Sequence, residues 1–123
     1  MNKELLFSLF KSLLDVDAAP VVICDKEGMV VYMNPSSLEH YHVNLVGRSI
    51  YDCHNAASCE KIKRVVAWFE KSGQNNQVYT YHNDKEEKDV YMIALRDETG
   101  ALIGFYEKHV YKTPERGALY DMP

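Results

Sequence analysis

The chain contains 123 residues, of which 46% are hydrophobic, and this length suits one domain with one core. Its 14 basic and 18 acidic residues give a formal net charge of −4 and are mixed along the chain, so no basic patch is available for nucleic acid or an anionic membrane. We therefore expect a single domain that binds neither nucleic acid nor membrane.

The first segment, from Lys3 to Leu14, carries large apolar residues in pairs four positions apart, which predicts an amphipathic helix. Polar residues interrupt the apolar run, so neither a secretion signal nor a membrane span fits, and we expect a cytoplasmic protein. Phe7 lies outside the stripe and widens the apolar surface, which indicates a partner helix. The expected contact is a homodimer through six residues: Leu5, Leu6, Leu9, Phe10, Leu13 and Leu14.

A hairpin and a short helix are predicted next. The apolar run Val21–Cys24, the turn-like sequence 25–28 and the run Met29–Met33 together predict two antiparallel strands. Asn34 followed by Pro35 is typical of a helix start, and the helix is expected to end near His40.

The second half is expected to hold a long helix and three strands. After a loop over 52–57, apolar residues at helical spacing predict a helix from Ser58 to Lys71, with Ser58 at its polar start. Strands are predicted over Gln77–His82, Val90–Arg96 and Leu102–Tyr111. Because short hairpins connect the strands on each side of the helical middle, the fold class is α+β, with an antiparallel sheet and helices on one face.

This order, with the residues that punctuate it, resembles the PAS domain family from about Ala19 to Thr113. The residues that carry the resemblance are the opening hairpin from Pro20 to Gly28, the sequence Tyr32-Met33-Asn34-Pro35, the segment Val46–Ile50, and the Arg-Asp-x-x-Gly-x-x-x-Gly pattern from Arg96 to Gly104. The resemblance implies a five-stranded sheet with a ligand pocket between sheet and helices. It divides the chain into a dimerisation helix (1–18), a PAS domain (19–113) and a tail (114–123).

A closer likeness is to the PAS subgroup with an Asp-Cys-His step, here Asp52-Cys53-His54, whose members often follow a hemerythrin-like region. Alternation places Tyr91 and Ile93 on one face of their strand, but the sequence does not say which face meets the helices. The residues expected to line the implied pocket are Ile23, Met33, Asn34, Ser37, Tyr41, Cys53, His54, Tyr91 and Ile93.

The chemistry of the Asp-Cys-His step leaves several readings open. His54 is a candidate haem ligand, because a neutral imidazole can bind iron, or it caps and packs. The long helix holds no histidine, where haem-binding relatives place theirs, and the Asn-Cys-Arg-Phe-Leu-Gln signature of flavin light sensors is absent, so flavin is not expected. Cys24, Cys53 and Cys59 are interpreted as free thiols, with reactive chemistry at Cys53 or Cys59 as the alternative.

No nucleophile with a base, phosphate loop or metal-binding motif is found, so we do not expect an enzyme. Three hypotheses follow: a sensory module that binds a small ligand or cofactor and signals through dimer or partner contacts, a ligand-free interaction and dimerisation module, and a haem or thiol redox sensor. Only ten residues follow Thr113, so output is expected to pass to a downstream signalling protein.

Overall fold

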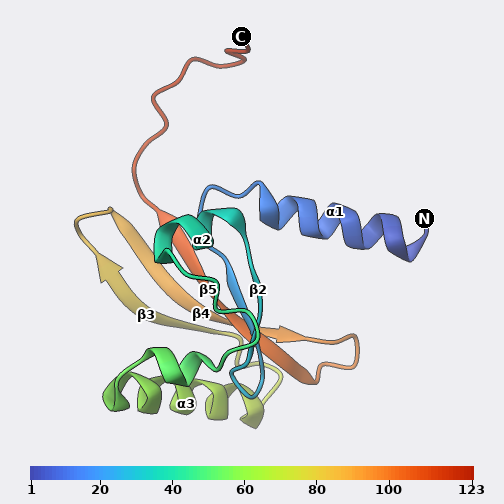
Figure 1. Ribbon diagram of the computed structural model, residues 1–123, viewed down its shortest axis with the longest axis vertical. Helices are drawn as coiled ribbons and strands as arrows, with labels where there is room; N and C mark the ends of the chain where they lie inside the picture. The colour runs from blue at the N-terminus through green and yellow to red at the C-terminus, as the bar shows by residue number, and fades with distance from the viewer.

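The computed structural model describes all residues, 1–123, and its centre is one antiparallel sheet of five strands (Figure 1). The strands lie in the order β2-β1-β5-β4-β3, so the first hairpin returns to pair with the last strand. Their bounds are β1 Val22–Asp25, β2 Val30–Met33, β3 Gln77–Asn83, β4 Lys88–Arg96 and β5 Leu102–Tyr111. The predicted α+β fold, a five-stranded antiparallel sheet with helices on one face and a separate N-terminal helix, is confirmed.

Two glycines allow close approaches that a side chain would prevent. Gly28 closes the β1–β2 turn with a φ of +88°, and a Cβ there would lie 2.5 Å from the ring of Tyr51. Gly104 lies where β5 meets β1, and a Cβ there would lie 2.3 Å from the carbonyl oxygen of Cys24. Both belong to the patterns that carry the PAS resemblance, which explains why glycine is needed at these points.

The helical middle consists of α2 (Pro35–Tyr41), a short 3₁₀ turn (Ile50–Cys53) and α3 (Ala56–Lys71). The predicted start of the long helix at Ser58 was two residues late. The N-cap is Asn55, whose side-chain oxygen accepts a hydrogen bond from the Ser58 backbone N–H at 2.8 Å. The predicted loop over 52–57 is correspondingly shorter, and β4 begins two residues earlier than expected.

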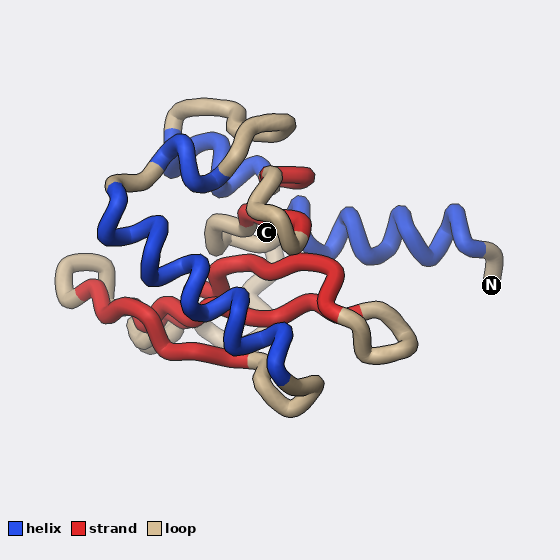
Figure 2. Tube along the Cα trace, turned by 90° about the horizontal axis from the view of Figure 1, so that it is seen from below, coloured by secondary structure: helices blue, strands red, loops and turns tan.

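The hydrophobic core lies between the sheet and α3, which crosses the strands (Figure 2). Phe69 of α3 is fully buried and contributes the largest core side chain. The buried cluster comprises Cys24, Val30, Met33, Phe69, Met92, Leu102 and Phe105. Because no other element covers the opposite face of the sheet, α3 and α2 define the side on which a cavity can form.

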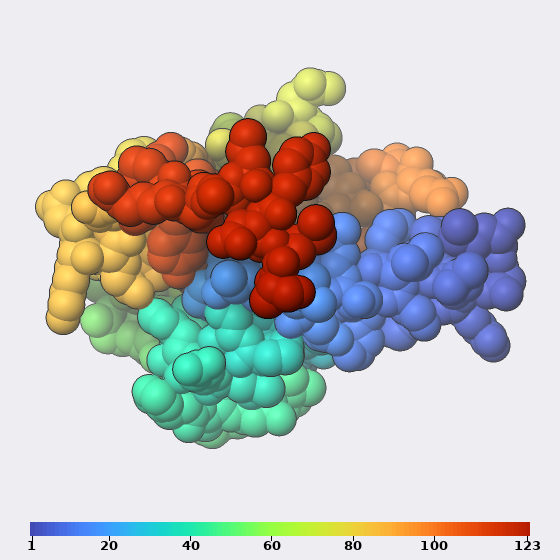
Figure 3. Space-filling view, turned by 90° about the horizontal axis from the view of Figure 1, so that it is seen from above, coloured from blue at the N-terminus to red at the C-terminus, as the bar shows by residue number.

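The N-terminal helix α1 (Lys3–Asp15) extends away from the body of the protein (Figure 3). None of its residues is buried, and apart from the half-buried Leu14 its leucines and phenylalanines are 40–67% exposed. Only its C-terminal end is attached: Tyr32 donates a hydrogen bond to the Asp15 carboxylate, and the Asn34 side-chain amide donates one to the Leu14 carbonyl at 2.9 Å. No helix in the chain is long and apolar enough to cross a membrane.

Candidate functional site

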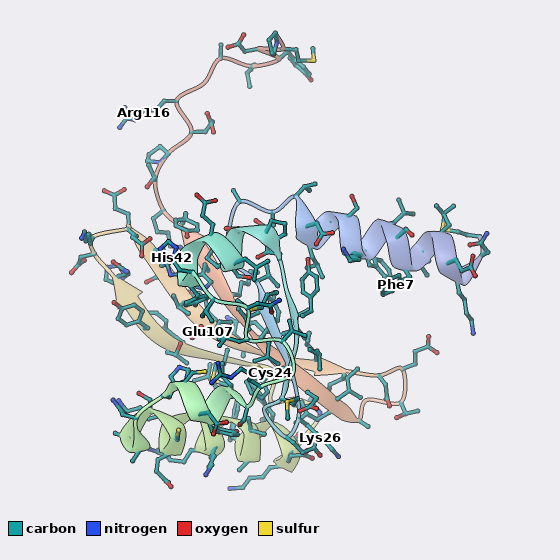
Figure 4. All side chains as sticks on the ribbon, viewed as in Figure 1. Phe7, Cys24, Lys26, His42, Glu107 and Arg116 are labelled. Carbon is teal, nitrogen blue, oxygen red and sulfur yellow. The ribbon has the colours of Figure 1, made fainter.

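The face of the sheet that meets the helices is fixed by strand register. Met92 of β4 pairs with Glu107 of β5, and Val90 pairs with His109, so these four side chains share one face. Met92 and Val90 are buried there. Figure 4 shows Glu107 in the space between α2 and α3, over the strands. This face therefore changes along its length from an apolar floor to a row of ionisable side chains.

The apolar end encloses a cavity of about 40 Å³. It is lined by Cys24, Ile50, His54, Ile62, Met92 and Phe105, among others. A cavity of this size accepts a few waters, whereas sites for drug-sized ligands are usually of the order of 300–1,000 Å³. A haem macrocycle does not fit beside His54 in this conformation.

His54 is oriented by a contact with the 3₁₀ turn. Its Nδ1 lies 2.9 Å from the Ile50 carbonyl oxygen, and because a carbonyl only accepts, Nδ1 carries the hydrogen. Cys24, on the same cavity, has its pKa raised to about 12 by burial, so its thiol is a poor nucleophile. All three cysteines are free thiols, as predicted.

The other end of the same face holds a polar cavity of about 220 Å³ under the C-terminal end of α2. Eight of its nine lining residues carry ionisable or hydrogen-bonding side chains: His40, Tyr41, Tyr81, Asn83, Glu86, Lys88, Glu107 and His109. Glu107 also lines the apolar cavity and so lies between the two. Its volume lies below that of drug-sized sites but above that of the apolar cavity, and its polar groups suit a small polar molecule.

Lys88 is the most unusual residue of the polar cavity, because only 3% of its side chain is exposed. Its Nζ lies 3.2 Å from Glu86 Oε2 and 5.4 Å from the centre of the Tyr111 ring. A lysine ammonium carries three donors, and one carboxylate with one aromatic face leaves donor capacity unused. Lys88 is therefore a buried cation that can still bind an acceptor.

His109 Nδ1 is the one buried side-chain nitrogen or oxygen in the chain that has no hydrogen-bond partner. Burial lowers the pKa of His109 to about 4, so its ring is neutral at pH 7. Burial also raises the pKa of the Glu107 carboxyl and raises that of the Tyr41 hydroxyl to about 12. Leaving a buried polar atom unpaired costs about 1–3 kcal/mol of stability. A hydrogen-bond partner from outside the chain would remove this cost at His109 Nδ1.

Comparison with known protein families gives one match: the model described as "PAS domain" covers residues 10–110. The chain belongs to the PAS domain family. No curated protein matches it.

Solved structures show the same PAS fold at low sequence identity. A crystal structure of a C-terminal domain from Streptococcus mutans is 23% identical, with a TM-score of 0.65 over 85% of this chain and 83% of that one. The PAS domain of BvgS from Bordetella pertussis is 19% identical, with a TM-score of 0.62 over 92% and 89%. A sensory box sensor histidine kinase from Vibrio cholerae is 14% identical, with a TM-score of 0.58 over 88% and 92%.

Two of the nine residues predicted for the PAS pocket line the cavities: Tyr41 the polar one and His54 the apolar one. Three others, Ile23, Tyr91 and Ile93, lie on the opposite face of the sheet. Register decides this, because Ile23 and Ile93 both pair with Tyr106, whereas the helix-side face carries Phe105 and Glu107. They do not line the space between sheet and helices.

The remaining predicted residues have structural surroundings. Asn34 and Ser37 are fully buried in a hydrogen-bond network, and Met33 belongs to the core. Cys53 is exposed and lines neither cavity. Lys88, Glu107 and His109 were not predicted as site residues, although alternation along β4 and β5 groups them once the helix-side face is known.

Proposed function

We propose that this PAS domain is a sensory module that binds a small polar molecule in the cavity between α2 and the sheet and signals through dimer or partner contacts. The observation that carries the proposal is the unpartnered Nδ1 of His109 in a cavity that also holds the buried Lys88. A ligand with an acceptor for Lys88 and a hydrogen-bonding group for His109 would satisfy both. Proteins similar in fold include the Vibrio cholerae sensor histidine kinase, which supports a sensory role.

A physical connection runs from this cavity to α1. Tyr41 and His40, at the C-terminal end of α2, line the cavity. At the other end of α2, Asn34 caps the helix and donates to the Leu14 carbonyl of α1. A ligand that moves α2 by binding under its end would therefore change how α1 is held, which is the kind of differential contact that a population shift requires.

Mass spectrometry of the purified protein under native conditions tests ligand binding, followed by identification of the released molecule. We expect a small polar molecule to copurify with the wild-type chain and to be lost from Lys88→Met, which removes the buried cation. Lys85→Met, which removes an exposed cation from the nearby β3–β4 turn, is the matched control and should keep it. Protein that carries no molecule, or a Lys88→Met variant that retains it, would refute the ligand site.

A second candidate function, dimerisation, is favoured by α1 itself. Leu9 is 48% exposed and Leu13 67% exposed, so the apolar face of this helix has no cover within the chain. We infer that a second copy of α1 covers it, as the PAS resemblance implies. The same resemblance is the ground for placing the chain in the Asp-Cys-His subgroup, whose histidine here packs against the 3₁₀ turn.

Light scattering tests the dimer. The wild-type chain is expected to show twice the monomer mass of 14.2 kDa, and the pair Leu9→Glu with Leu13→Glu should reduce it to the monomer mass because charges replace the apolar contact. Ser8→Glu with Ser12→Glu adds the same charge at the same spacing on the polar face and should leave the dimer intact. A monomeric wild-type protein would rule out the α1 contact.

A further inference from the structure

The two edges of the sheet differ in how they are protected. At the β2 edge, Val30 donates a backbone hydrogen bond to Arg48 and accepts one from Gly47, at 2.9 and 2.8 Å, so the segment before the 3₁₀ turn covers this strand. The β3 edge pairs only with β4 and makes no backbone hydrogen bond to any other segment. β3 thus presents an open row of backbone donors and acceptors.

The open edge is long and only lightly protected. β3 has seven residues, about 23 Å of strand, against four residues in β2. Proteins normally blunt such an edge with lysine, proline or a covering segment, because a free edge pairs with other chains. The sequence of β3 contains neither lysine nor proline, and a bulge between Tyr79 and Tyr81 is its one protective feature. An edge left free in this way is suited to accept a strand from outside.

A groove runs between this edge and α3, and its charge is positive. It is lined on the helix side by Lys61, Arg64 and Lys71 and contains no acidic residue. None of these three side chains forms an ion pair or a hydrogen bond within the chain. The whole chain has a net charge of −4, so these three unpaired cations make the groove positive on a protein that is negative overall.

The groove also offers apolar contact area between the cations. Trp68 of α3 is 40% exposed and lines it, whereas the 57% exposed ring of Tyr79 packs against Tyr91 on the opposite face of the sheet. Half-exposed aromatic side chains flanked by cations are typical anchors in protein interfaces. The groove thus combines a free strand edge, an exposed tryptophan and three cations.

We propose that the β3 edge and the groove beside α3 bind an acidic, extended segment of a partner protein, which adds a sixth strand next to β3. Its main chain would pair with β3 and alternate carboxylates would meet Lys61, Arg64 and Lys71, while the apolar side chains between them would lie on the other face, beside Tyr79. Three cations beside a free strand edge suit an acidic peptide better than a nucleic acid, because a phosphate backbone needs a longer row of basic residues. This inference is independent of whether the polar cavity holds a ligand.

Fluorescence anisotropy of the full chain with a labelled peptide that alternates glutamate and valine tests the proposal. We expect saturable binding that is at least about tenfold weaker for Arg64→Glu with Lys71→Glu, and unchanged for Lys26→Glu, which reverses an exposed charge in the β1–β2 turn, outside the groove lining. Strand addition further predicts that N-methylation of one alternate set of peptide amides abolishes binding, whereas methylation of the other set does not. Circular dichroism confirms that the variants are folded.

Three results would overturn the proposal. The first is an absence of saturable binding below about 1 mM, or equal binding of a peptide with lysine in place of glutamate. The second is competition by single-stranded oligothymidine as strong as by the acidic peptide, which would make the groove a nucleic-acid site. The third is a lower mass of Arg64→Glu with Lys71→Glu in light scattering, which would make the groove a contact between copies of this chain.

Discussion

Replacing Asn34 with alanine is expected to lower the free energy of unfolding by about 3 kcal/mol. The Asn34 side chain is fully buried, and its oxygen accepts from the backbone N–H groups of Val21 and Ser37, both at 2.9 Å. Its amide donates to the carbonyls of Leu14 at 2.9 Å and Ala19 at 3.0 Å. Alanine would leave the Val21 N–H and the Ala19 carbonyl without partners in a site that excludes water, and would remove one of the two bonds at Ser37 and at Leu14.

Urea denaturation measures this loss, with Asn44→Ala as the matched control. Asn44 is exposed, and its oxygen accepts a single local hydrogen bond from Val46 at 3.0 Å, so its replacement should cost less than about 1 kcal/mol. Asn34→Ala should also expose the segment between α1 and β1 to proteolysis, because one of the two side-chain contacts that hold α1 is lost. If the two alanine variants were equally stable, the network around Asn34 would not have the role assigned to it.

The order of elements could be predicted because it depends on local signals. The apolar spacing of α3, the Asn-Pro start of α2 and the glycines of the β1–β2 and β4–β5 turns each require a particular backbone conformation from neighbouring residues. Boundaries were less certain where two polar residues compete as a cap, as Asn55 and Ser58 do at the start of α3. Local interactions therefore predict the type of an element more reliably than the residue at which it begins.

The candidate site could be predicted only in part, because burial is a property of the assembled sheet. Both faces of β4 carry apolar side chains, so alternation alone could not tell whether Tyr91 or Met92 meets the helices, and the pairing with β5 decided it. Lysine and histidine are usually exposed, so nothing in the sequence marked Lys88 as buried or His109 as having a buried Nδ1. The helix-start pattern correctly predicted that Asn34 caps α2. Its hydrogen bond to α1 joins residues far apart in the sequence, so local patterns could not predict it.

Replacing Arg96 is expected to produce a stability loss of similar size at the other end of the molecule. Its guanidinium donates to the carbonyls of Phe69 at 2.7 Å and Ser72 at 3.0 Å, at the C-terminal end of α3, and to the side-chain oxygen of Asn76 at 2.7 Å. A further bond reaches the Gly100 carbonyl at 3.1 Å in the β4–β5 turn. One planar group thus joins α3 to two connections of the sheet, and it places a positive charge at the negative end of the helix.

We expect Arg96→Ala to lower the free energy of unfolding by about 3 kcal/mol and Arg96→Lys to recover less than half of this, because an ammonium keeps the charge but lacks the fork. Arg48→Ala, which removes an exposed arginine, should change stability by less than about 0.5 kcal/mol. Urea denaturation of the three variants gives the comparison, and full recovery by lysine would show that charge alone matters. Arg96 bonds the C-terminal end of α3 to the sheet, so a loss of stability with alanine would also show that these bonds hold α3 in place.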